Sequence, residues 1–258
     1  MQHLKIALLQ ADLVWQNATQ NRKQFSRKIN AIKENVDLIV LPEMFTTGFS
    51  MQPQQMAETM QGETVKWMQQ LASEKQAAIV GSIIISEDNK YYNRFLFVHP
   101  SGEINQYNKR HLFTLAREDD AYTSGNEKLI VNYNGWKICP LICYDLRFPV
   151  WARNTEDYDV LLYVANWPKP RIAAWDTLLK ARAIENMCYS IGVNRVGIDA
   201  NKLEYSGHSV AYDCLGKKLT HIKTNQEDMA IVTLSKKHIK DVRAKLNFLN
   251  DKDSFKIN

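Results

Sequence analysis

The 258-residue sequence lacks the patterns that mark nucleotide-binding and membrane-spanning proteins. It has only ten glycines, no GxGxxG motif and no phosphate-binding P-loop, which leaves little support for a nucleotide site. No window is long and apolar enough to span a bilayer, and the apolar run before Gln10 and Asp12 is too short for a secretory signal. We therefore expect no membrane as a partner.

The sequence also lacks paired metal ligands. Its four cysteines form no CxxC pair, and no two histidines have the spacing typical of zinc ligands, so we expect no metal site. Reduced thiols fit a cytoplasmic protein best, because that compartment keeps cysteines free. The cysteines are Cys139, Cys143, Cys188 and Cys214.

The charge balance is mild. Lys and Arg number 33 and Asp and Glu number 28, a net charge of +5, and the positive residues are scattered along the chain. Such a balance does not indicate a nucleic-acid partner. The densest basic run, residues 236–245, contains Ile239 and Val242 at helical spacing, so we interpret it as the solvated face of a helix.

Apolar runs typical of strands alternate with amphipathic helical stretches along the whole chain, which predicts buried sheets covered by helices. Helices are expected after Asn17, after Gly62 and after Pro170. The apolar runs are residues 4–10, 38–41, 77–85, 94–98, 141–144, 160–165, 190–196 and 230–234.

Residues 77–85 and 90–104 are separated by a short turn and are typical of antiparallel strands, so a purely parallel sheet is disfavoured. We expect a mixed α+β or α/β fold in one domain over residues 1–258. Residues 247–258 resemble a partly ordered C-terminal tail.

Three segments each place one reactive residue beside a predicted strand end: Glu43 in LIVLPEMFTTGF, Lys109 in QYNKRHLFT and Cys143 in LICYDLRFP. A neutral cysteine is a poor nucleophile near pH 7. It needs a carboxylate to take the thiol proton and a cation to stabilise charge on the attacked oxygen. Glu43, Lys109 and Cys143 can supply these three roles.

Taken singly, each of these residues also has a simpler interpretation. Cys143 could pack in the core, Glu43 could start a helix or form a surface ion pair, and Lys109 could be a solvated cation. Glu118 begins an acidic run that is either a solvated loop or a second carboxylate beside Lys109. Pro140 suggests an edge, a bulge or a late start for the strand before Cys143.

The three segments resemble the glutamate, lysine and cysteine motifs of the nitrilase superfamily of carbon-nitrogen hydrolases. The similarity runs nearly the whole length, in the same order, and includes VANWPKPR, AWDTLLKARAIENM and SGHSVAYDCLG. ICYDLRFP, ANWP and ARAIEN are most similar to the omega-amidase branch. The resemblance implies a four-layer αββα sandwich that forms a homodimer across the helices near residues 147–154 and 181–187.

The resemblance also implies a mechanism without metal or organic cofactor. Glu43 would be the base and Cys143 the attacking thiolate. Lys109 and the backbone N–H of Tyr144 would stabilise the oxyanion, and Glu118 would be the second acidic residue. A papain-like dyad of Cys143 with His111 is the rejected alternative, because the flanking residues resemble the other family so specifically.

The omega-amidase branch acts on small molecules: terminal amides of short dicarboxylic monoamides and of 2-oxo acids such as 2-oxoglutaramate. Such anions need a cationic contact, for which Arg171 is our candidate, with Trp167 and Phe45 as pocket walls. Arg147 is the rival, although we expect it to pair with Asp145 or another acid as part of the scaffold.

The sequence leaves two alternatives open. The same machinery could act on an N-carbamoyl amine, a nitrile or a plain aliphatic amide. A protein of this fold could also be a non-catalytic oligomeric binding platform, because fold alone does not establish activity.

Overall fold

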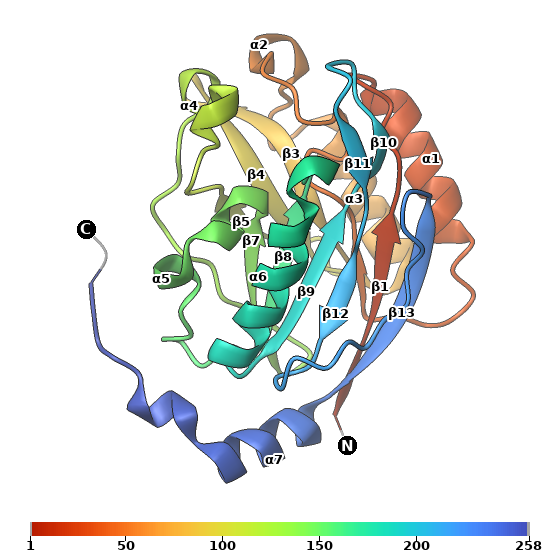
Figure 1. Cartoon of the computed structure of the whole chain (residues 1–258). Coiled ribbons are helices and arrows are strands. Elements are labelled where there is room, and N and C mark those ends of the chain that lie inside the picture. The colour runs from red at the N-terminus through yellow and green to blue at the C-terminus, as the bar shows by residue number, and fades with distance from the viewer. Residues whose placement is uncertain (1, 257–258) are drawn as a thin grey trace.

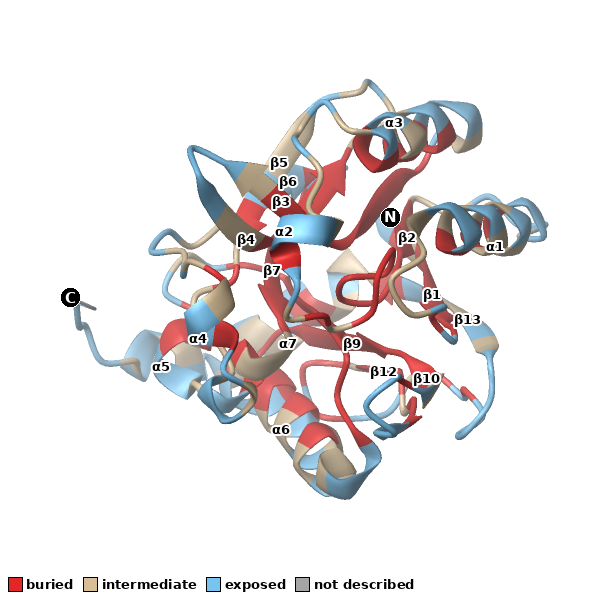
Figure 2. Ribbon diagram, turned by 90° about the horizontal axis from the view of Figure 1, so that it is seen from above, coloured by how far each residue is buried: buried red, intermediate tan, exposed pale blue. Residues whose placement is uncertain are grey.

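The computed structural model describes residues 2–256 and shows two β-sheets packed face to face between outer layers of helices (Figure 1). Figure 2 shows α1 and α3 on one side of the buried strands and α5 and α6 on the other. The four-layer αββα arrangement expected from the resemblance is confirmed.

The first sheet has six strands in the order β13-β1-β2-β3-β4-β5. β1 pairs with β2, and β2 with β3, in parallel, whereas the other pairs are antiparallel, so the expected mixed sheet and the β3–β4 hairpin are confirmed. Its strands are β1 (His3–Gln10), β2 (Leu38–Val40), β3 (Ala78–Glu87), β4 (Lys90–Val98), β5 (Ile104–Asn108) and β13 (Asp228–Ser235).

The second sheet has five strands in the order β12-β9-β8-β7-β6, and β7, β8 and β9 run parallel. A separate two-stranded hairpin joins β10 to β11. These strands are β6 (Val131–Tyr133), β7 (Trp136–Ile142), β8 (Val160–Ala165), β9 (Tyr189–Asn194), β10 (Val196–Ile198), β11 (Glu204–Ser206) and β12 (Val210–Tyr212).

Helices form after Asn17, Gly62 and Pro170, as predicted. α1 begins after Asn17, whose Oδ1 accepts a hydrogen bond from the Gln20 N–H at 3.0 Å. The helices are α1 (Ala18–Asn30), α2 (Pro53–Met56), α3 (Glu63–Lys75), α4 (Glu118–Ala121), α5 (Pro149–Ala152), α6 (Ile172–Glu185) and α7 (Lys236–Leu246). Short 3₁₀ helices span Thr114–Ala116, Cys143–Arg147, Lys169–Arg171 and Phe248–Asp251.

Both faces of the first sheet are buried, which explains the continuous apolar runs. In β1, Leu4, Ile6 and Leu8 belong to the core between the sheets, whereas Ala7 and Leu9 pack in the core beneath α1 and α3. Successive side chains of a strand point to opposite faces, so a strand between two layers must be apolar throughout. Within residues 2–256, no helix is both long and apolar enough to cross a membrane.

Pro140 lies inside β7, and the expected edge position is confirmed locally. β7 pairs with β6 only as far as Ile138, so Pro140 pairs with Leu162 of β8 but has no strand partner on its other side among the described residues. The missing N–H of proline therefore breaks no ladder hydrogen bond there.

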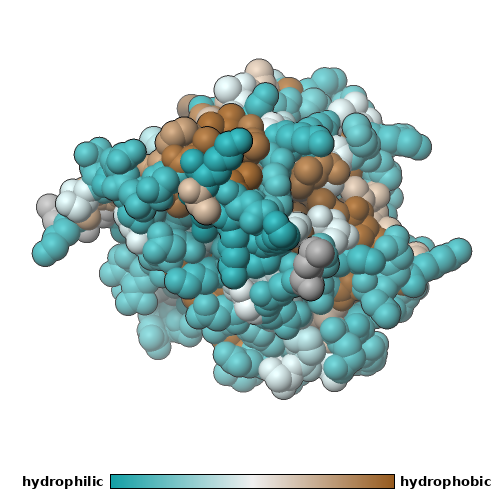
Figure 3. Space-filling view, turned by 90° about the horizontal axis from the view of Figure 1, so that it is seen from below, coloured by the Kyte–Doolittle hydropathy of each residue, from teal (hydrophilic) through white to brown (hydrophobic). Residues whose placement is uncertain are grey.

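The predicted basic helix is α7, with Ile239 buried and Lys237, Lys240 and Lys245 exposed, whereas Lys236 is half-buried and pairs with Asp159. Figure 3 shows hydrophilic side chains over most of the face seen from below, with hydrophobic ones in separate groups.

The predicted C-terminal tail contains the short helix Phe248–Asp251 and otherwise has no regular structure up to residue 256. Residues 257–258 of the predicted tail lie outside the described residues.

Candidate active site

The reactive residues gather at the ends of strands from both sheets. Glu43 follows β2 and Lys109 follows β5 in the first sheet, whereas Cys143 follows β7 and Asn166 follows β8 in the second. Open sheets with parallel strands bind ligands beyond the carboxyl ends of those strands, because loops and side chains there are free to form a cleft. The face-to-face packing of the sheets therefore brings residues distant in sequence to one place.

Strained turns carry two of these segments. Cys143 has a φ of +43°, and Met44, directly after Glu43, has a φ of +41°. Side-chain-bearing residues rarely adopt this region, and such strain collects at functional sites. The Met44 N–H donates to Ser82 Oγ at 2.9 Å, which holds the turn after Glu43 in place.

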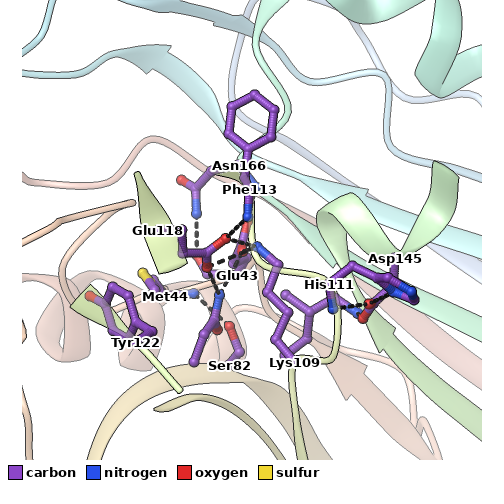
Figure 4. A network of polar contacts seen from close by, with 12 residues as sticks. Glu43, Met44, Ser82, Lys109, His111, Phe113, Glu118, Tyr122, Asp145 and Asn166 are labelled. Atoms are coloured by element: carbon purple, nitrogen blue, oxygen red, sulfur yellow. Dashed lines mark hydrogen bonds and ion pairs between the residues drawn. The ribbon is translucent and has the colours of Figure 1, made fainter. Parts of the chain in front are cut away.

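Lys109 lies between two carboxylates at the centre of the site (Figure 4). Its Nζ donates to Glu43 Oε1 at 3.0 Å and to both oxygens of Glu118, at 3.0 and 2.9 Å. All three side chains are buried. The solvated interpretations of Lys109 and Glu118 and the surface interpretation of Glu43 are therefore wrong.

The charges of this cluster shift one another's pKa values. Burial alone would lower the pKa of Lys109, but Glu118 and Glu43 outweigh it and raise the pKa above the usual range of lysine. Lys109 therefore stays a cation. The pKa of Glu118 is raised, first by burial and further by Glu43, against the opposing charge of Lys109.

The Cys143 thiol adjoins this cluster. Burial raises its pKa well above the usual value, and the negative charge of Glu43 and a hydrogen bond with Glu43 raise it further, whereas Lys109 acts in the opposite direction. The thiol is thus protonated at rest, and the adjacent carboxylate can accept its proton when the sulfur attacks.

A cavity of about 350 Å³ opens beside the thiol, and Lys109, Cys143 and Tyr144 contribute to its lining. Tyr144 is the second residue of the 3₁₀ helix Cys143–Arg147. N–H groups in the first turn of a helix have no partner within it, so they can donate to a ligand.

Two predicted substrate-binding residues line this cavity, and one does not. Trp167 and Arg171 are lining residues, and the Trp167 Nε1–H donates to the Arg171 carbonyl at 2.8 Å. Phe45 is fully buried in the core and packs against Trp67, so the prediction that it forms a pocket wall is wrong. Phe49, four residues further on, lines the cavity instead.

The expected ion pair of Arg147 with Asp145 is also wrong. Among the described residues, the guanidinium of Arg147 makes no ion pair or hydrogen bond; it lies 5.0 Å from the centre of the Trp167 ring and lines the cavity. Asp145 instead receives hydrogen bonds from other groups. Arg147 is therefore free to meet a ligand.

His111 does not form a dyad with Cys143. Its Nδ1 lies 2.8 Å from Asp145 Oδ1, and its ring stacks on Phe148 with centroids 3.7 Å apart. Within residues 2–256, no group of three or more histidine, cysteine and acidic side chains is arranged to hold a metal ion.

Sequence reasoning missed two asparagines that hold Glu43. Asn93 Nδ2 donates to Glu43 Oε1 at 2.7 Å, and the Asn166 N–H donates to Oε2 at 2.8 Å. Asn93 is a polar residue next to the apolar part of β4, which is the one signal that could have drawn attention to it. Asn166 belongs to the quoted ANWP motif, but nothing there specifies a contact with Glu43.

A family model described as carbon-nitrogen hydrolase matches residues 5–244. The chain belongs to this family. An omega-amidase of Escherichia coli K12, YafV, is 44% identical over 257 residues, 100% of both chains. A 2-oxoglutaramate amidase of Bacillus subtilis is 34% identical over 83% of this chain and 84% of its own length. The family and these relatives identify this carbon-nitrogen hydrolase as an enzyme.

Solved structures agree with the family assignment. A CN-hydrolase superfamily protein of Xanthomonas campestris, with an arsenic adduct in its active site, is 41% identical, with a TM-score of 0.97 and coverage of 100% of both chains. A carbon-nitrogen hydrolase of Helicobacter pylori has a TM-score of 0.86 at 19% identity, covering 97% of this chain and 95% of its own, which shows the shared fold.

Replacing Glu43 by glutamine should lower the pKa of the Cys143 thiol in this carbon-nitrogen hydrolase. The charge of Glu43 and its hydrogen bond both raise that pKa, whereas Lys109, which lowers it, remains. The thiolate should therefore appear at lower pH in Glu43→Gln than in the parent. Ultraviolet absorbance of the thiolate during a pH titration measures this, with Cys143→Ala as the blank; an unchanged or higher pKa would contradict the arrangement.

Proposed function

We propose that this enzyme is an omega-amidase that converts the terminal amide of a short dicarboxylic or 2-oxo acid monoamide, such as 2-oxoglutaramate, to the acid and ammonia. The observation that carries the proposal is the buried contact of Lys109 with Glu43 and Glu118 beside the Cys143 thiol. The names of the Escherichia coli and Bacillus subtilis relatives support the substrate class.

In the first half-reaction, Glu43 takes the thiol proton as Cys143 Sγ attacks the amide carbon, and a carbon–sulfur bond forms. Lys109 Nζ and the Tyr144 N–H stabilise the negative charge on the former carbonyl oxygen. Glu43 then gives the proton to the amide nitrogen, the carbon–nitrogen bond breaks and ammonia leaves. A thioester on Cys143 remains.

In the second half-reaction, Glu43 takes a proton from water, which attacks the thioester carbon. The carbon–sulfur bond breaks, the thiolate regains the proton and the acid leaves. Glu118 positions Lys109 by accepting two of its hydrogen bonds, so the ammonium stays fixed through both halves. No step requires a metal or an organic cofactor.

The lining of the cavity also suits an anionic substrate. The guanidinium of Arg171 lies 5.1 Å from the centre of the Phe113 ring, and within residues 2–256 it makes no ion pair or hydrogen bond, as is true of Arg147. An unpaired guanidinium offers a planar fork of donors to a carboxylate. We assign Arg171 to the distal carboxylate, with Trp167 as an apolar wall, and keep Arg147 as the rival.

We further propose that two copies form a homodimer across the face that carries α5 and α6. Val150 of α5 and Ile184 of α6 are 56% and 48% exposed. Arg153, directly after α5, donates to the Glu185 carbonyl at the end of α6, so the two helices share one face. Exposed apolar side chains on one face are typical of an interface.

The cytoplasmic location remains a prediction. All four cysteines are free thiols, which supports it.

The purified enzyme should release ammonia from 2-oxoglutaramate and succinamate. Cys143→Ala should abolish turnover because no thioester can form, and Glu43→Gln should do the same in a protein that still folds. A coupled ammonia assay measures both. Full activity in Cys143→Ala would refute the proposal, and carbon dioxide release from an N-carbamoyl amine in its place would indicate a carbamoylase.

Arg171→Ala should raise KM for 2-oxoglutaramate about 10- to 100-fold, since losing one charge-assisted contact weakens binding by about 1.5–3 kcal/mol. The matched variant Arg147→Ala should have the smaller effect. Butyramide, which has no distal carboxylate, should be hydrolysed equally by both variants and the parent. A larger effect of Arg147→Ala would show that Arg147, and not Arg171, binds the distal carboxylate.

In sedimentation velocity the parent should have the mass of two chains. Val150→Asp with Ile184→Asp should reduce it to one, because two carboxylates would be buried unpaired. Val14→Asp, also at an exposed valine but beside α1, is the control and should stay dimeric. A single-chain mass for the parent would exclude the dimer.

A further inference from the structure

Asp145 is a buried carboxylate that the proposed mechanism does not use. It lies two residues after Cys143, and its side chain is fully buried. Oδ2 accepts hydrogen bonds from the Ile142 N–H at 3.0 Å and from the Tyr107 hydroxyl at 2.8 Å. Oδ1 lies 3.0 Å from the His111 N–H, which donates to it, and 2.8 Å from His111 Nδ1.

These four contacts join the two segments that carry the nucleophile and the cation. Ile142 is the last residue of β7, directly before Cys143. Tyr107 and His111 lie two residues before and two residues after Lys109. Asp145 therefore binds the chain on one side of Cys143 and on both sides of Lys109. Figure 4 shows Asp145 and His111 beside the Lys109 cluster.

The partners of Asp145 are themselves fixed. The Tyr107 hydroxyl accepts hydrogen bonds from Trp151 Nε1 at 3.1 Å and from the Arg110 N–H at 3.2 Å. The His111 ring stacks on Phe148 with an interplanar angle of 5°. A side chain held at both oxygens by fixed donors can set the distance between the segments that carry those donors.

We infer that Asp145 is a positioning residue that fixes Cys143 and Lys109 relative to each other. The inference rests on the proposed function, in which the sulfur attacks a carbonyl whose oxygen meets Lys109. A misplacement of about 1 Å between groups that act on one carbon can lower the rate about 100-fold without weakening binding. The strained φ of Cys143 makes such a tie necessary, because an unsupported positive-φ turn would relax.

The chemistry of the site favours a carboxylate at position 145. An ionised carboxylate only accepts hydrogen bonds and has about four acceptor positions, whereas an asparagine side chain has one accepting and one donating end. In Asp145→Asn, the Nδ2 group would therefore replace one of the two oxygens and face the groups that donate to that oxygen. The substitution preserves size but removes the hydrogen bonds at one of the two oxygens, either those from Ile142 and Tyr107 or those from His111.

The test compares Asp145→Asn with the parent in kcat, in KM and in the rate at which iodoacetamide alkylates Cys143, followed by peptide mass spectrometry. We expect kcat to fall about 100-fold with KM changed less than 3-fold, since substrate contacts stay and the geometry of attack is lost. We expect alkylation of Cys143 to change in rate as well.

Asn154→Asp is the matched control, an exchange of amide and carboxylate in another fully buried group. Asn154 makes hydrogen bonds with the backbone of Tyr158 and with Asn186, and it does not line the cavity. This variant should lower the unfolding temperature but leave kcat per folded molecule unchanged. If Asp145→Asn behaves in the same way, the positioning role is overturned and Asp145 only stabilises the fold.

His111→Ala serves if Asp145→Asn does not fold. His111 is partly exposed, and its loss removes one of the four contacts. We expect kcat to fall about 3- to 10-fold with KM unchanged; an unchanged kcat would overturn the inference. Alkylation of Cys143 needs no substrate. If the variants alter the alkylation rate but the parent releases no ammonia from any amide, the positioning role stands and the proposed function is refuted.

Discussion

One buried ammonium between two buried carboxylates is the constraint on which the site depends. Removing these charges from water is unfavourable, and the short contacts of Lys109 with Glu43 and Glu118 compensate for it only while all three side chains stay in place. Loss of one partner from such a buried group costs about 3–5 kcal/mol. The same arrangement holds a cation where an oxyanion can form and a carboxylate where a thiol proton can be accepted.

The sandwich makes this arrangement possible because the two sheets contribute different parts. The first sheet supplies the carboxylate after β2 and the ammonium after β5, and the second supplies the thiol after β7. The core between the sheets fixes their separation, because close-packed protein interiors resist deformation. Hydrogen bonds at Asp145, Asn93 and Asn166 then position the side chains of the site between the two sheets.

The sequence was most informative where the physical signal was local. A polar residue directly after an apolar strand marks a strand end, so Glu43 and Cys143 could be located, and alternating apolar runs predicted the layers. Contacts between segments far apart in sequence leave no such signal. The partnership of Asn93 with Glu43 was therefore missed, and Phe45 was misplaced because sequence spacing does not reveal which way a loop side chain points. Arg147 was wrongly paired for the same reason.

The most direct test of the central claim is to trap the covalent intermediate. Enzyme mixed with succinamate and quenched in acid within one turnover should gain the mass of the acyl group without its nitrogen, and peptide mass spectrometry should locate that mass on Cys143. An adduct on any residue other than Cys143 would contradict the account.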